Sequence, residues 1–151
     1  MHIPAKVDYG LRALLVLAAG DEAMTSRALA RDQDLPAGFL SAILNDLRRA
    51  GIVTNRRGPD GGYRLSRPAD TITVADVMRV LDGPLARVRG ARPEATDYAG
   101  SAQHLQLVWI AVRANLRNVL EHVTLLDVVN GQVPPTAHDL DESVNLRALP
   151  G

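Results

Sequence analysis

The sequence predicts a mainly α-helical fold with a small β-hairpin, arranged as a winged helix-turn-helix domain followed by a long dimerisation helix. Two short amphipathic helices, separated by a few residues, come directly before a glycine-rich hairpin. Further along the chain, apolar residues recur at heptad spacing between residues 105 and 123. The first pattern is typical of a winged helix-turn-helix, and the second is typical of a helix that pairs with a second copy.

Three helices are expected before the hairpin. The first ends at Gly20 and carries one apolar stripe, which consists of Val7, Leu11, Leu14, Leu15 and Ala18. Thr25 is suited to cap the second helix, which continues through Leu29 and Ala30. Pro36 is allowed at the first position of the third helix. That helix ends near Gly51, and its apolar stripe consists of Leu40, Ile43, Leu44 and Leu47.

The hairpin is expected to pair Ile52-Val53-Thr54 with Tyr63-Arg64-Leu65 around the tip Pro59-Asp60-Gly61-Gly62. In such a tip proline presets φ, aspartate bonds its own backbone and glycine accepts a positive φ. A fourth helix then starts at Thr73-Val74-Ala75-Asp76, which resembles a capping box, and closes at Gly83-Pro84.

Residues 84–100 are expected to form a loop, since Gly90, Pro93 and Gly100 interrupt any helical pattern. Residues 101–123 then predict a helix of roughly 35 Å. Its apolar positions step by four and three residues and are Leu105, Trp109, Val112, Leu116, Val119 and Val123. A row of this kind needs a covering surface, so we expect a symmetric dimer, with packing on the same chain as the alternative. Thr124 would cap a short helix that ends at Gly131.

This organisation divides the chain into four parts. Residues 1–83 form the winged helix-turn-helix domain, 84–100 the loop, and 101–131 the dimerisation helix with the short helix after it. Residues 132–151 are expected to be a weakly ordered acidic tail that contains Pro134-Pro135, Asp139, Asp141 and Glu142.

The charge distribution is uneven although the net charge is zero. Residues 1–92 carry fourteen basic and ten acidic side chains, a net of +4, whereas residues 93–151 carry three and seven, a net of −4. Residues 48–67 alone hold six arginines and one aspartate. Such local clustering favours a polyanionic partner, and a solvated charged face is the alternative.

The third helix has the properties of a recognition helix, which presents small and polar side chains to base edges in the major groove. Its exposed face is expected to carry Pro36, Ala37, Gly38, Ser41, Ala42 and Asn45. Ser41 and Asn45 would read bases, and Arg48 and Arg49 at the helix end would reach phosphates. Phe39 is either a core aromatic residue or a backbone contact.

The hairpin is expected to act as the wing. Arg56 and Arg57 precede its glycine-rich tip, and a narrow minor groove attracts arginine. Arg64 would hold a phosphate, and Tyr63 would pack at the hairpin base. The residues expected to contact double-stranded DNA are Thr25, Ser26, Ala37, Gly38, Phe39, Ser41, Ala42, Asn45, Arg48, Arg49, Arg56, Arg57, Gly61 and Arg64.

Several other classes of function are disfavoured by the sequence. The absence of cysteine excludes disulfides, thiolate zinc sites and all-cysteine iron–sulfur ligation. The four histidines are scattered without metal-ligand spacing, and no nucleophile motif or phosphate-cradling loop appears. We therefore expect no enzyme activity, no metal and no cofactor. With no apolar run long enough to span a membrane and no signal-peptide pattern, a cytoplasmic protein is expected.

The segments RGPDGGYRLSRP, ITVADVMRVLDG and, after the long helix, VTLLDVV resemble the IscR, NsrR and CymR regulators, also called the Rrf-two family. The resemblance runs from about Lys6 to Gly131. It implies a homodimeric winged-helix transcription regulator that binds imperfect palindromes in promoters, often as a repressor.

The chain departs from that family at the loop, where many members hold an iron–sulfur cluster through three cysteines. Here the loop reads RVRGARPEATDYAGSAQ. Asp8 stands at the position similar to the fourth ligand of nitric-oxide-sensing members, but without cysteine partners it is not interpreted as a ligand. The recognition helix also has Phe39-Leu40-Ser41-Ala42 where family members often have Tyr-Leu-Glu-Gln, so no known operator is transferred.

Two further hypotheses remain open. One is that the chain is similar to the cluster-free CymR branch, which responds to sulfur status through a protein partner, cysteine synthase. In that case Arg87, Arg89 and Arg92 would form a pocket for a small anionic effector, with the acidic tail as another docking segment. A dimeric adaptor that binds protein instead of DNA is the other hypothesis, disfavoured by the arginine-lined wing.

Overall fold

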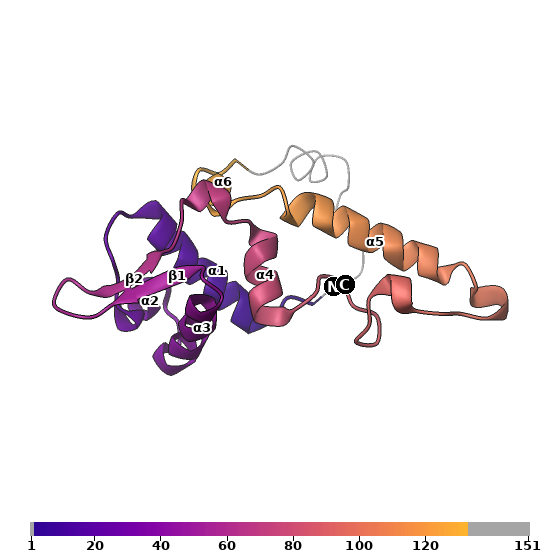
Figure 1. The fold of residues 1–151 in the computed structure, drawn as a ribbon, viewed down its shortest axis with the longest axis horizontal. Helices are drawn as coiled ribbons and strands as arrows, with labels where there is room; N and C mark the ends of the chain where they lie inside the picture. Colours follow the sequence, from indigo (N-terminus) through magenta and orange to yellow (C-terminus); the bar gives the residue numbers. More distant parts are fainter. Residues whose placement is uncertain (1, 133–151) are drawn as a thin grey trace, which may run out of the picture.

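The computed structural model describes residues 2–132 as a helical domain with a projecting hairpin and one long helix that extends away from it (Figure 1). Its helices and strands are α1 (Ala5–Ala19), α2 (Ser26–Gln33), α3 (Ala37–Arg49), β1 (Val53–Arg56), β2 (Gly62–Leu65), α4 (Val74–Asp82), α5 (Leu105–Leu120) and α6 (Leu125–Val129). Short 3₁₀ turns lie at Ala69–Thr71, Pro93–Ala95 and Gly100–Ala102. The predicted fold class is confirmed. The tail expected over residues 132–151 lies, except for Gln132, outside the described residues.

α1 lies at the centre of the core and contacts α2, α3, α4 and α6. Its buried positions include Val7, Ala13, Leu14 and Leu17, which belong to the same buried cluster as the leucine and isoleucine side chains of α3. Burial of this apolar surface, at about 25 cal/mol per Å², is the main term that stabilises the domain. The apolar face of α3 is thus packed on the core, and its opposite face is left to solvent.

The helix ends follow the predicted caps, with one correction. The Thr25 hydroxyl accepts a hydrogen bond from the Ala28 N–H at 3.1 Å, and Asp34 ends α2 in the left-handed conformation with φ of 52°. Pro36, expected at the first helical position, instead precedes the helix as its N-cap, with an extended ψ of 112°. The turn between α2 and α3 is therefore made by Asp34, Leu35 and Pro36.

The hairpin is held at its base by a segment that the sequence analysis did not include. β1 and β2 pair antiparallel with Val53 opposite Leu65 and Arg56 opposite Gly62. Met24 adds a third extended position, because it exchanges backbone hydrogen bonds with Tyr63 at 3.0 and 2.7 Å. The chain between α1 and α2 thereby joins the wing to the helical core.

α5 is shorter than predicted. It runs over sixteen residues, because residues 100–102 form a 3₁₀ turn before it and the chain becomes extended after His122. Val123, expected to be the last dimerisation position, is instead 7% exposed and lies next to the start of α4, where the Val74 N–H donates to its carbonyl at 2.9 Å. Its heptad position is therefore covered by its own chain.

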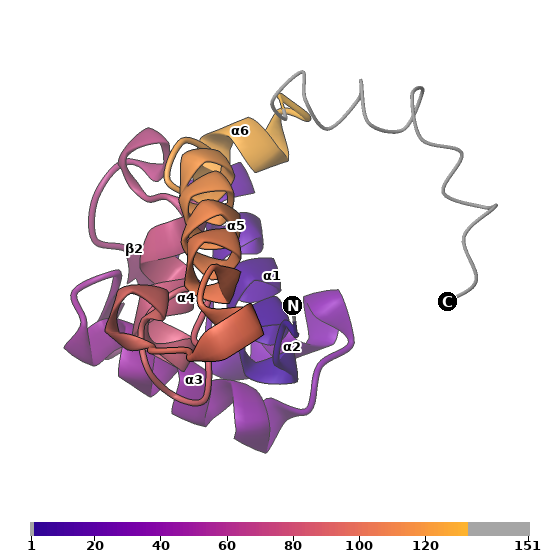
Figure 2. The same cartoon turned by 90° about the vertical axis from the view of Figure 1, so that its right-hand side faces the viewer.

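α6 belongs to the helical core by its packing. Leu125 is fully buried, α6 contacts α1, and the Leu125 N–H donates to the Ile72 carbonyl at 2.9 Å. Viewed along α5, the short helix lies at the far end of the long one and beside α1 (Figure 2). Within residues 2–132, no helix is long and apolar enough to cross a lipid bilayer.

Candidate nucleic-acid interface

α3 presents the two faces that its sequence predicts. Leu40, Ile43, Leu44 and Leu47 are at most 1% exposed. The opposite side carries exposed small and polar residues, namely Pro36, Ala37, Gly38, Ser41 and Ala42, and the half-buried Asn45. Because these side chains are small, the backbone of α3 can come close to the base edges in a groove.

The polar side chains on this face are already oriented by neighbours. The hydroxyls of Ser26 and Ser41 lie 2.9 Å apart, which connects the start of α2 to α3, and the Ser41 hydroxyl also donates to the Ala37 carbonyl at 3.2 Å. The Asn45 side-chain oxygen accepts a hydrogen bond from Arg48 at 2.8 Å. These contacts leave the amide N–H₂ of Asn45 as its group for a base edge.

Two contacts fix α3 against α1. Lys6 pairs with Asp46 at 2.9 Å, and this hydrogen bond, together with the lysine charge, lowers the pKa of Asp46. Phe39 is 50% exposed, and its ring meets Tyr9 edge-on with centroids 5.9 Å apart. Phe39 is thus not a core residue, since it packs on α1 and keeps half of its surface exposed, and its contact with the DNA backbone stays a prediction.

The wing carries unpaired basic side chains. Arg56, Arg57 and Arg64 are exposed, and none forms an ion pair within the described residues. Gly61 closes the tip by donating its N–H to the Gly58 carbonyl at 2.9 Å, and a Cβ atom there would lie 2.2 Å from the Arg56 carbonyl oxygen. The tip is thus compact, as insertion into a narrow groove requires. Figure 1 shows it at one extremity of the molecule.

The structure adds a basic residue that the sequence analysis left out. Arg27 is exposed at the second position of α2, directly after Ser26, and makes no ion pair among residues 2–132. The signal for it was present in the sequence, because Arg27 directly follows Thr25 and Ser26, which were both assigned to the DNA interface.

The exposed face of α5 is apolar. No residue of this helix is buried, and Leu105, Val112 and Val119 are 37%, 44% and 42% exposed. Trp109 and Leu116 on the same stripe are half-buried. A shallow groove of about 680 Å³ follows the helix and is lined by Val108, Ala111, Val112, Asn115, Leu116, Val119 and Leu120. Packing on the same chain therefore does not cover the stripe before Val123.

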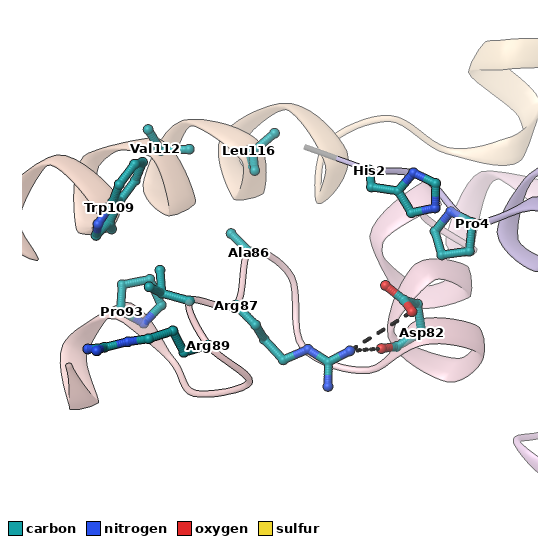
Figure 3. Close-up of a pocket in the computed structure, with 11 residues that line it drawn as sticks. His2, Pro4, Asp82, Ala86, Arg87, Arg89, Pro93, Trp109, Val112 and Leu116 are labelled. Atoms are coloured by element: carbon teal, nitrogen blue, oxygen red, sulfur yellow. Dashed lines mark hydrogen bonds and ion pairs between the residues drawn. The ribbon is translucent and has the colours of Figure 1, made fainter.

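The three loop arginines predicted to form one anion pocket are divided between two pockets. Arg87 and Arg89 line a pocket of about 600 Å³ between the loop and α5, together with Trp109, Val112 and Leu116 (Figure 3). There Arg87 turns to Asp82, donating to its carbonyl at 2.7 Å, and the Arg89 guanidinium stacks on Tyr98 at 5.4 Å. Arg92 lines a different, smaller pocket beside α4.

Comparison with known proteins agrees with this geometry. A family model described as "Rrf2: Iron-dependent Transcriptional regulator" matches residues 3–131. A protein of Mycobacterium tuberculosis (strain H37Rv) named as a candidate HTH-type transcriptional regulator, Rv1287, is 43% identical over 136 residues, which cover 89% of this chain and 84% of that protein. The HTH-type transcriptional regulator CymR of Bacillus subtilis is 32% identical over 86% of this chain and 91% of its own length.

The solved structure of CymR, described as the global cysteine regulator of B. subtilis, superposes with a TM-score of 0.75 at 32% identity. The match covers 87% of this chain and 98% of that one. The long helix and the wing of this chain are thus parts of an architecture seen in a solved regulator.

The residues of this chain do not fit the iron–sulfur cluster that the resemblance to this family implies. The sequence contains no cysteine, so no thiolate can ligate iron. Within residues 2–132, no three side chains of the His, Asp or Glu type gather where they could hold a metal ion.

Proposed function

Because this chain belongs to the Rrf2 family of transcriptional regulators, we propose that it represses promoters by binding an imperfect palindrome as a homodimer without an iron–sulfur cluster. A transcriptional regulator of this type is not an enzyme, and we place its action in the cytoplasm, where the DNA is. The proposal rests on one observation: an exposed small and polar face on α3 lies in the same domain as a wing whose exposed arginines form no ion pair within residues 2–132.

Recognition is proposed to divide between two grooves. Ser41 and Asn45 would contact base edges in the major groove, with Ala42 against a thymine methyl group. Arg56 and Arg57 would enter the adjacent minor groove, and Arg48, Arg49 and Arg64 would neutralise phosphates. Thr25, Ser26, Ala37, Gly38, Phe39 and Gly61 would shape the surface, and Arg27 would add a phosphate contact.

Dimerisation is proposed through α5. The stripe of Leu105, Trp109, Val112, Leu116 and Val119 remains partly exposed, and an apolar row of this length on one helix is best covered by the same row of a second copy. Two copies related by a twofold axis would present two recognition helices to two half-sites, which is the geometric origin of a palindromic operator.

A second candidate function is control of sulfur or cysteine metabolism in the manner of CymR. The similarity to CymR in sequence and structure favours it, as does the lack of cysteine ligands. In this version a protein partner or a small anion, rather than a cluster, would change operator binding.

Both candidates are tested by selecting fragments of the source genome with the purified protein. Anisotropy titration of the enriched fragment at two salt concentrations would follow. We expect a palindrome bound far more tightly than random duplex, with log K falling against log[salt] by roughly 0.9 for each phosphate neutralised.

Genes beside the enriched sites decide between the candidates. Sites next to genes of sulfur or cysteine metabolism would support the CymR-like function. Weak binding without sequence preference, in the presence and absence of candidate effectors, would contradict both and favour a protein-binding adaptor.

A further inference from the structure

Three arginine side chains from three segments converge on a pocket of about 260 Å³ where α4, the loop and α5 meet. The pocket is lined by Arg79 of α4, by Gly83, Pro84, Leu85 and Arg92 of the loop, and by Arg113 of α5. Only Arg92 belongs to the set of loop arginines predicted from the sequence. The other two, Arg79 and Arg113, lie on α4 and α5, and their positions in the sequence do not indicate that these two helices meet.

Two of these arginines make contacts that leave other donors free. Arg113 is only 14% exposed, and it donates from Nε to the Leu85 carbonyl at 3.3 Å and from Nη1 to Glu94 at 2.7 Å. Arg79 pairs with Glu121 through Nη2. Among the described residues, Nη2 of Arg113 and Nε and Nη1 of Arg79 make no hydrogen bond.

The charge at this junction is not balanced. Arg79, Arg92, Arg113 and Arg117 face two carboxylates, Glu94 and Glu121, which leaves a net of +2. The nearby Asp82 and Arg87 pair with one another and do not change that sum. A backbone hydrogen bond, and then the charge of Arg113, lowers the pKa of Glu94, and hydrogen bonds from Arg117 and Arg79 lower the pKa of Glu121. Both carboxylates are therefore ionised at neutral pH and supply no further compensation.

We propose that this pocket, formed by Arg79, Arg92 and Arg113, binds an oxyanion of the phosphate type. Guanidinium groups present paired N–H donors that match the oxygens of such an anion, and a doubly charged anion would balance the local excess of positive charge. The pocket has ample room for a phosphate group, supplied either by inorganic phosphate or by the phosphate end of a metabolite.

A bound oxyanion would connect the DNA-binding core to the dimerisation helix. Arg79 lies in α4, which packs on α1 and α3, whereas Arg113 lies in the middle of α5. A role as effector site rests on the proposed function, but binding of the anion does not.

The test is isothermal titration of the purified full-length chain, without DNA, with inorganic phosphate and separately with glycerol 3-phosphate. Sodium chloride at matched ionic strength is the control. We expect binding below about 10 mM, and Arg92→Ala should weaken it about tenfold, the loss typical of one charge-assisted hydrogen bond. Arg92 is chosen because it is exposed and its removal leaves the Arg113 contacts intact.

Arg89→Ala is the matched comparison, since it removes the same charge from the same loop but lies outside this pocket. Binding of inorganic phosphate, or of the ester alone, would support the site and identify the source of the anion. No heat with either probe, or equal weakening by Arg92→Ala and Arg89→Ala, would overturn it. Because DNA is absent, this result is independent of whether the chain binds an operator.

Discussion

Gly62 has a backbone conformation and a neighbour that both exclude a side chain. Its φ is +133°, and a Cβ atom would lie 2.6 Å from the backbone of Met24, the residue that joins the wing to the core. Gly58 in the same hairpin has φ of +114°, but nothing lies within 4 Å of its Cβ position. Substitutions at the two glycines can therefore be compared to separate the effect of backbone strain from the effect of a steric clash.

We expect Gly62→Ala to destabilise the protein by more than Gly58→Ala. Both substitutions should incur backbone strain of about 1–3 kcal/mol, and only Gly62→Ala should also break the pairing of Met24 with Tyr63. Thermal or urea unfolding of the two variants measures the difference. Equal destabilisation would mean that the Met24 contact contributes nothing to stability.

Arg57 is the residue on which the proposed wing contact depends most. It lies in the exposed tip, beside Arg56 and without an ion pair among the described residues, so its replacement should leave the fold unchanged. We expect Arg57→Ala to weaken binding to the selected operator by about 1–3 kcal/mol, measured by anisotropy at fixed salt.

Arg31→Ala provides the control for charge, since Arg31 is exposed in the last turn of α2 and outside the proposed DNA contacts. It should change operator affinity much less. An unchanged affinity of Arg57→Ala would remove the wing from the recognition mechanism.

At the scale of the element, α6 depends on one reciprocal cap. The Asp127 carboxylate accepts hydrogen bonds from the Thr124 N–H at 2.9 Å and the Thr124 hydroxyl at 2.7 Å, and the Asp127 N–H donates to that hydroxyl at 3.1 Å. The hydrogen bonds to the charged carboxylate, first from the backbone and then from the hydroxyl, lower the pKa of Asp127.

The lowered pKa predicts how stability depends on pH. Because the folded state binds the Asp127 proton less readily than the unfolded state, the cap contributes fully above the ordinary aspartate pKa of about 3.9 and is lost as the pH falls below it. Thermal unfolding from pH 7 to pH 3 should show the native chain more stable than Asp127→Asn at pH 7, with the difference shrinking in acid. Asp70→Asn, which removes an exposed charge, should show no such convergence.

The sequence predicts the helices and strands better than it predicts which parts of the chain pack against them. Thr25, Thr73 and Thr124 were identified as caps because capping is local, and all three accept the expected hydrogen bonds. Val123 was misassigned, because a heptad pattern is the same whether the covering surface is the same chain or a partner. The pairing of Met24 with Tyr63 was missed since a single extended residue leaves no periodic signal.

Among the candidate sites, too, local features could be predicted from the sequence and long-range contacts could not. The exposed face of α3 follows from the 3.6-residue period alone, so its residues could be identified without coordinates. The approach of Arg79 to Arg113 could not, because thirty-four positions separate them and only the packing of α5 beside α4 brings them to one pocket.

For the whole molecule, the stripe on α5 provides the test of assembly. Val112 is 44% exposed at its centre, whereas Ala114 is exposed on the opposite side of the helix. A buried and uncompensated carboxylate is strongly unfavourable, so Val112→Glu should weaken the dimer by roughly a hundredfold or more and operator binding with it. Sedimentation or light scattering at several concentrations measures this.

Ala114→Glu should remain a dimer, since its charge would stay in solvent. A native chain that is monomeric at all concentrations, or a Val112→Glu variant that dimerises as well as Ala114→Glu, would contradict assembly through this stripe.

The chain leaves the helical core after α4 and rejoins it beside the start of α4. The return is fixed by the backbone hydrogen bonds of Val74 with Val123 and of Leu125 with Ile72, while Gln106 and Arg113 bind the outgoing loop to α5. In mechanical terms, α5 is a cantilever: its C-terminal end is fixed to the core, and its N-terminal end extends away from the core and is tied to the loop through Gln106 (Figure 1). A rotation of α5 would therefore be transmitted to α4, which packs on α1 and α3. In the proposed dimer, a small rotation of the two α5 helices would change the distance between the two α3 helices.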